Sequence, residues 1–203
     1  MPTAIWGASH LPVPTARGGR WPAPEPVRPL GLFDSWWFIG AAAVGSTGIL
    51  AAALWVATHV HPDPALRTAG LFVHLAGLVL GFGGVLIADY LTVLWLLGRS
   101  TLVEAMRGVS RLHVPIWVGL AALVASGCVL EPNLSSPLTQ AKMVLIVLLT
   151  INGLQATLLS KHLADAASAP LPIRLLLWGA ISGAISQVCW WGAIAIGFWN
   201  SQR

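Results

Sequence analysis

The sequence predicts an all-α integral membrane protein, a bundle of five transmembrane helices. Two observations support this prediction: only 9% of the 203 residues are charged, and the charges leave five long intervals without Asp, Glu, Lys or Arg. A soluble domain carries about 25% charged residues. The shortest interval covers 18 residues and the longest 28, and roughly 20 apolar residues in a helix cross a bilayer core. A soluble globular protein, a disordered chain and a nucleic-acid-binding domain are therefore excluded.

The spans are expected to be helical, because backbone amides in lipid need hydrogen-bond partners within their own segment. A transmembrane β-barrel would show short alternating segments, whereas runs such as 144–149 are continuously apolar. Five such spans use most of the chain. The sequence therefore predicts one membrane domain over 31–203 and no soluble domain.

Residues 1–30, ahead of the first span, are predicted to form a proline-rich cytoplasmic arm. Seven prolines in this segment disfavour helix and sheet pairing, and it has no apolar stretch of signal-peptide length. The first span, and not a removed leader, is therefore expected to direct insertion. The arm is either disordered or a strap that lies on a partner subunit.

The apolar intervals and the prolines between them place the five spans. The spans are expected at about 35–58, 69–97, 112–130, 140–160 and 173–199. Prolines mark three of the four connections: Pro62 and Pro64, Pro132 and Pro137, and Pro170 and Pro172. The remaining connection, over 99–111, has no proline and suits a short amphipathic turn around Glu104 and Arg107.

The distribution of Lys and Arg predicts the orientation of the bundle. Eight of these residues fall on the side of the N-terminal arm and three on the other side. Cytoplasmic loops are enriched in Lys and Arg, so the N-terminus is expected in the cytoplasm and the C-terminus outside. Tryptophans are expected at the two membrane interfaces, namely Trp36, Trp37, Trp55 and Trp199. We expect a multi-pass protein of the bacterial inner membrane.

Small residues indicate how the helices meet. Ridges of such residues occur in three spans: Gly77, Gly81, Gly84 and Ala88 in the second, Gly179 and Gly183 in the fifth, and Gly40, Gly45 and Gly48 in the first. Such ridges let helix backbones approach closely in lipid. Tight packing within the bundle is the main expectation, and a ridge that holds a flat cofactor is the alternative.

Polar side chains inside apolar spans are candidates for function, because they are costly to place in lipid. His59 and His61 end the first span, His74 lies about two turns into the second, and Lys142 stands near the start of the fourth. His74 is suited to ligate the iron of haem b, the metal of another tetrapyrrole, or copper, with His59 or His61 as partner. Alternatively, His59 and His61 are interfacial and His74 is a hydrogen-bonded packing residue.

Lys142 has three possible roles. It extends outward to the interface, pairs with Glu131 across the short connection, or faces a propionate of a bound cofactor. Cys128 and Cys189 are too few for a disulfide scaffold. Both are expected in the outer halves of their spans, where either one disulfide or two buried free thiols would fit.

A second polar group lies toward the cytoplasmic side and consists of Asp89, His113, Asn152, Gln155 and His162. Asp89 follows His74 by 15 residues, which places both on the bundle-facing side of one helix. Asn152 and Gln155 share a helix face and are expected to supply the hydrogen-bond donor that Asp89 needs. His113 and His162 lie near one interface, where they either pair as haem ligands or lie among lipid headgroups.

Three local patterns resemble those of known membrane proteins. They are Gly81-Phe82-Gly83-Gly84 followed by Asp89, Ser126-Gly127 ending the third span, and Lys142 followed by Asn152-Gly153. Over residues 69–160 the chain resembles uncharacterised bacterial multi-pass proteins and the copper-resistance protein D-like and cytochrome b561-like helical bundles. The resemblance implies a membrane bundle in which paired histidines on neighbouring helices hold haem. Here His74 is the histidine placed clearly within a span, and its partner stays open.

Three classes of function follow. The favoured class is a non-catalytic membrane subunit or assembly factor of a larger respiratory or photosynthetic electron-transfer complex. It is favoured because each candidate ligand also has a structural explanation and no group of candidates has a diagnostic spacing. In addition, hydrolase, metalloprotease, phosphate-loop and CxxC motifs are missing from the sequence. The expected partners are then the lipid bilayer and protein subunits that contact the arm, and not nucleic acid.

The first alternative is a b-type haem redox module, a membrane oxidoreductase that passes electrons to quinone or metal. It would use His74 as ligand, His59 or His61 as partner, and Lys142 beside a propionate. The second alternative is a small-solute or ion transporter in which Asp89 and Asn152 line a polar path.

Overall fold

The computed structural model describes residues 36–166 and 172–202 of the chain. Its regular secondary structure in these ranges consists of five helices and no strand: α1 (Trp36–His59), α2 (Pro64–Leu96), α3 (Leu102–Gly127), α4 (Pro137–Ala166) and α5 (Ile173–Ser201). All five are long and apolar enough to cross a membrane. The predicted fold class is confirmed. The arm over 1–30 lies outside the described residues.

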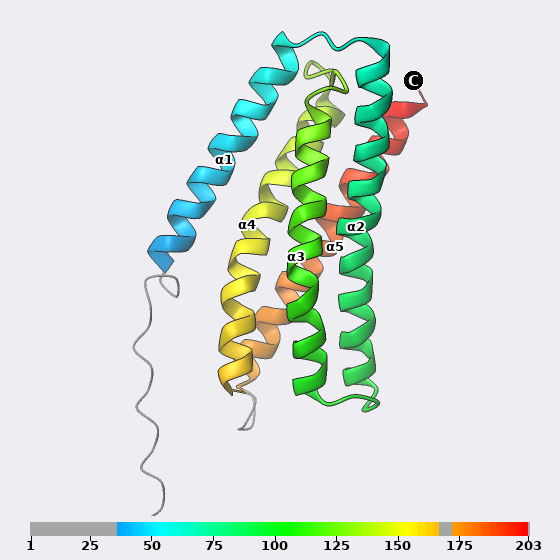
Figure 1. Ribbon diagram of the computed structural model, residues 1–203. Coiled ribbons are helices and arrows are strands. Elements are labelled where there is room, and N and C mark those ends of the chain that lie inside the picture. Colours follow the sequence, from blue (N-terminus) through cyan, green and yellow to red (C-terminus); the bar gives the residue numbers. More distant parts are fainter. Residues whose placement is uncertain (1–35, 167–171, 203) are drawn as a thin grey trace, which may run out of the picture.

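The five helices run alternately in opposite directions (Figure 1). The start of α1, the α2–α3 connection, the end of α4 and the start of α5 therefore lie at one end of the bundle. The α1–α2 and α3–α4 connections and the end of α5 lie at the opposite end. α2 packs closely on α3, and α4 packs on α5. α1 leans away at its first turns and contacts mainly α4 and α3.

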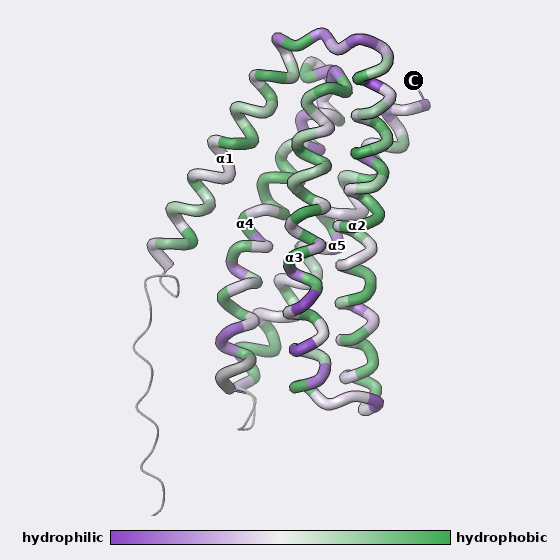
Figure 2. Tube along the Cα trace, in the orientation of Figure 1, coloured by the Kyte–Doolittle hydropathy of each residue, from purple (hydrophilic) through white to green (hydrophobic). Residues whose placement is uncertain are grey.

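Apolar side chains cover the outside of the bundle. Figure 2 shows hydrophobic residues along the helices, with hydrophilic residues mostly near the helix ends and in the connections. Phe72 is 75% exposed and Val44 is 74% exposed in the isolated chain. Exposed apolar surface on this scale is unsuited to water, whereas lipid would cover it. The exterior therefore agrees with a membrane location.

Caps explain where α2 and α3 begin. The side chain of Asp63 accepts a hydrogen bond of 2.7 Å from the Leu66 amide, and Pro64 occupies the first turn of α2. Thr101 and Glu104 form a capping box, in which each side chain accepts from the other residue's backbone amide. α3 therefore begins at Leu102, ten residues before the start that the sequence predicts for the third membrane span.

The other boundaries differ less from the predicted spans. α1 and α5 agree with the predicted spans to within two residues, whereas α2 begins five residues earlier and α4 extends six residues further. A helix can continue through polar residues beyond its apolar stretch. The length of a charge-free interval is therefore a lower estimate of the length of the helix. Pro115 lies inside α3 without ending it.

The core lies where α2, α3, α4 and α5 meet, and it is built around glycines. Val85, Leu120, Leu149, Cys189 and Trp190 form the buried cluster. Gly77 and Gly81 of α2 face Gly119 of α3 so closely that a Cβ on Gly119 would collide with their backbone atoms. The packing predicted for the α2 ridge is confirmed.

The ridges of α1 and α5 behave differently. A Cβ added at Gly40, Gly45 or Gly48 of α1, or at Gly179 or Gly183 of α5, would meet no other atom within 4 Å. The expectation that these ridges pack inside the bundle is therefore wrong for the described part of the chain. Among the described residues, the buried position of α1 is Ala57 near its end, and those of α5 are Ser182, Cys189 and Trp190.

Candidate functional site

A cavity of about 490 Å³ lies between the helices and receives side chains from all five of them. Most of its lining residues are apolar, and they include Leu120, Leu149 and Trp190 of the core cluster. His74 of α2 and Lys142 of α4 are its histidine and lysine, and no Asp or Glu lines it within the described residues. The cavity thus brings together two of the residues that the sequence singled out.

A serine on α3 holds the ring of His74. Nδ1 of His74 lies 2.9 Å from Oγ of Ser126, and the same Oγ donates to the Ala122 carbonyl at 2.6 Å. A hydroxyl has one proton, so Ser126 accepts from His74 and the Nδ1 atom of the ring is the donor. This bond fixes the tautomer and the orientation of His74 at the cavity wall.

The amine of Lys142 lies beside the last turn of α5. Its side chain is half-buried, and Nζ lies 3.6 Å from the position that a Cβ on Gly197 would take. The amine therefore rests against α5. Glu131, its other predicted partner, forms an ion pair of 3.3 Å with Arg67 instead. The pairing of Lys142 with Glu131 is therefore not formed, and outward extension and contact with a propionate both stay predictions.

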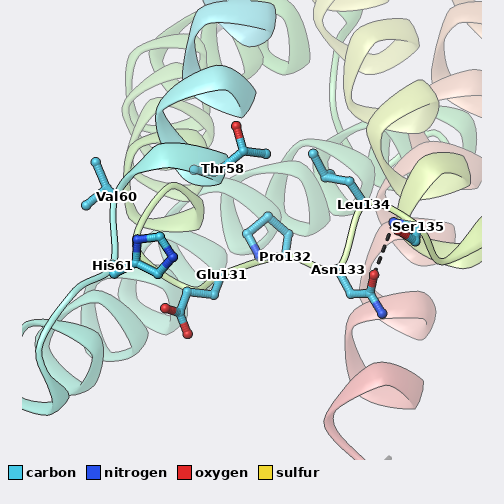
Figure 3. A pocket seen from close by; sticks show the side chains of 9 residues that line it. Thr58, Val60, His61, Glu131, Pro132, Asn133, Leu134 and Ser135 are labelled. Atoms are coloured by element: carbon cyan, nitrogen blue, oxygen red, sulfur yellow. Dashed lines mark hydrogen bonds between the residues drawn. The ribbon is translucent and has the colours of Figure 1, made fainter.

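The predicted partners of His74 lie elsewhere. His59 is exposed, stacks on the Trp55 ring at a centroid distance of 4.4 Å, and lies 2.8 Å from the Trp55 carbonyl through Nδ1. His61 borders a separate open pocket of about 370 Å³ beside the α3–α4 connection (Figure 3). Neither residue lines the His74 cavity. The pairing of His74 with either of them is therefore not formed, and both occupy the end of the bundle, as the interfacial interpretation expects.

The pocket beside His61 is shaped by the backbone of the α3–α4 connection. Figure 3 shows His61 and Glu131 on one side and Asn133 and Ser135 on the other. The Asn133 side chain accepts a hydrogen bond of 3.1 Å from the Ser135 amide, which stabilises the turn. Within the described residues, no group of three or more His, Cys, Asp or Glu side chains is arranged to hold a metal ion.

The hydrogen-bond donor to Asp89 is Gln187 of α5. Its Nε2 donates to Oδ2 of Asp89, and its Oε1 accepts from Nε1 of Trp191 at 3.0 Å. The expectation that Asn152 or Gln155 supplies this donor is wrong. Sequence reasoning did not single out Gln187. Like Asp89, it is a polar residue beside or within a long apolar stretch, and that pattern could have identified it.

Asn152 and Gln155 belong to a separate network that joins α4 to α5. Nδ2 of Asn152 donates to the Ser182 carbonyl at 2.9 Å, and Oδ1 accepts from Ser182 Oγ at 3.1 Å and from Gln155 Nε2 at 2.7 Å. Asn152 and Ser182 are buried. The polar atoms satisfy one another, so this network holds the two helices together.

The remaining candidate residues do not form a common site. His162 lies 6.5 Å from Trp178 between ring centroids, with an interplanar angle of 36°. His113 is half-buried on α3, and no contact between the two rings is found within the described residues. Cys128 and Cys189 are free thiols. The disulfide alternative is therefore wrong, and Cys128 instead donates to the Val124 carbonyl at 3.4 Å.

Comparison of this chain with models of protein families, with curated proteins and with solved structures finds no match. The resemblance to copper-resistance protein D-like and cytochrome b561-like bundles is thus supported by no comparison. The structure by itself shows a multi-pass helical bundle suited to a membrane.

Proposed function

We propose that this chain is a non-catalytic integral membrane subunit, or an assembly factor, of a larger membrane complex. The proposal is supported by one observation above all: a Cβ added at the glycines of α1 would meet no atom of the described residues within 4 Å. Ala41, Gly45, Gly48 and Ala52 recur at the spacing of one helix face, and all four are exposed. Glycine destabilises a helix by about 1 kcal/mol relative to alanine, so an unused ridge brings no benefit to the isolated bundle.

In lipid, small residues matter because they allow a second helix to approach closely. The ridge of α2 already serves this purpose against Gly119. The ridge of α1 is likewise built of glycine and alanine and has room for a partner helix, and Gly179 and Gly183 of α5 offer a second open face. We infer that a helix of another subunit packs on α1. The proposed host is a respiratory or photosynthetic electron-transfer complex.

The proposed location is the bacterial inner membrane, with the N-terminus in the cytoplasm. Basic residues support this orientation. At the end of the bundle that holds the start of α1, the described residues include Arg99, Arg107, Arg111, Lys161 and Arg174, against Arg67 and Lys142 toward the other end.

The geometry gives less support to the alternatives. A b-type haem held by two histidines needs a second ring opposite His74, and no other described histidine lines that cavity. A polar path through Asp89 and Asn152 would need these side chains to lie along one channel. Asp89 is bonded to Gln187, and Asn152 belongs to the separate α4–α5 network.

Substitution of the α1 ridge tests the proposal. With Gly45→Leu and Gly48→Leu together, we expect the chain to insert normally but to separate from its complex on native gels after mild solubilisation. The control Ala51→Leu adds one leucine at an exposed position beside the ridge, and it should migrate with the complex. A double variant that migrates like the unmodified chain would refute the ridge as the contact.

Deletion of residues 1–30 tests separately whether the arm holds the chain to a partner subunit. Normal migration of the shortened chain with the complex would exclude that role.

A further inference from the structure

The cavity between the five helices combines a cation with an apolar lining. Its volume of about 490 Å³ falls within the range of roughly 300–1,000 Å³ for small-molecule sites. Leu, Ile, Val and Ala residues dominate the lining, and Trp190, Leu120 and Leu149 connect it to the buried core. Such a lining favours a hydrocarbon chain, because each buried methylene group contributes about 0.8 kcal/mol.

The described residues place no acidic side chain beside Lys142. Its Nζ makes no hydrogen bond or ion pair with any described residue, and no described Asp or Glu lines the cavity. The nearest acid along the sequence, Glu131, is paired with Arg67. Charged side chains within membrane segments are normally paired. A ligand with a negatively charged group would supply the partner that half-buried Lys142 lacks among the described residues.

The position of Lys142 suits the head of an amphiphile. Lys142 follows the first residue of α4 by five positions, which is about 7.5 Å along the helix axis. Lys142 therefore lies near one end of the bundle, where it would meet the carboxylate of an amphiphile whose chain extends between the helices. His74 follows the first residue of α2 by ten positions and adds a hydrogen-bonding group whose orientation Ser126 fixes. The apolar part of the cavity continues toward Trp190.

We propose that this cavity binds a single-chain amphiphile with a carboxylate headgroup, a long-chain fatty acid, whose carboxylate pairs with Lys142 and whose chain fills the space between the helices. This proposal is independent of any partner on the α1 ridge. It requires no metal and no second histidine.

Binding of oleate to the full-length chain in neutral phosphatidylcholine nanodiscs tests the proposal. Oleyl alcohol has the same chain without the charge, and we expect it to bind about tenfold or more weakly, because the charge-assisted hydrogen bond to Lys142 is lost. Lys142→Met should weaken oleate binding by a similar factor and leave the alcohol unchanged. Lys142→Arg retains the charge and should keep oleate binding within about threefold.

Lys161→Met is the matched control, since it removes a lysine from the far end of the same helix, away from the cavity. It should bind oleate like the unmodified chain. Thermal stability of each variant shows whether it is folded. Equal binding of oleate and the alcohol, or equal loss in both Met variants, would overturn the proposal. Equally potent displacement of oleate by phosphatidylglycerol, or a tetrapyrrole or quinone spectrum in the purified protein, would also overturn it.

Discussion

Gln187 shows how a single polar residue in an apolar helix acquires a structural role. It donates to Asp89 on α2 and accepts from Trp191 on its own helix, so it connects α2 to α5. In lipid the amide and the carboxyl group have few other partners. Removing one of them leaves the other without its bond, and that loss exceeds the value of the bond itself.

Substitutions at this pair should be strongly non-additive. Gln187→Leu leaves Asp89 without its donor and should lower the free energy of unfolding by about 1–3 kcal/mol. Combining it with Asp89→Leu should recover most of that loss, because two apolar residues replace a satisfied polar pair. Unfolding titrations in mixed detergent micelles measure both effects. A double variant less stable than Gln187→Leu would contradict this account of the pair.

At the scale of the helices, the close packing of α2 on α3 depends on glycines, which have no side chain. Gly119 lies against the backbone of Gly77 and Gly81, and Ile116 fills the space over Gly84. The sequence showed where small residues recur, but not which of these ridges meets another helix. That outcome depends on the rotation of each helix about its axis, which the whole bundle determines.

Two glycine-to-alanine substitutions distinguish the effect of helix–helix packing from the effect of helix propensity. Gly119→Ala places a methyl group against the α2 backbone, which cannot move aside, and should destabilise the bundle by about 1–3 kcal/mol. Gly83→Ala has open space around its Cβ and should be neutral or stabilising by up to about 1 kcal/mol, since alanine is the better helix former. Thermal unfolding midpoints in detergent compare the two. Equal midpoints would show that α2 and α3 do not pack this closely.

For the whole molecule, much of the fold follows from charge. The intervals without charge predicted five spans, and all five are helices in the structure. Helix ends were less predictable: the capping box at Thr101 and Glu104 extends α3 by ten residues beyond the apolar interval. The sequence identified two residues of the candidate site, His74 and Lys142. It did not identify the residues that they contact. Which side chains meet across the bundle depends on helix rotation and tilt, as Asp89 illustrates with Gln187.

The account depends centrally on five membrane crossings, because the outward ridge, the lipid-facing surface and the cavity all assume them. Reporters fused to the two termini and to the α2–α3 and α3–α4 connections test this most directly, with one reporter active only in the cytoplasm and another active only after export. We expect the N-terminus and the α2–α3 connection in the cytoplasm, and the C-terminus and the α3–α4 connection outside. Two termini on the same side of the membrane would contradict the account.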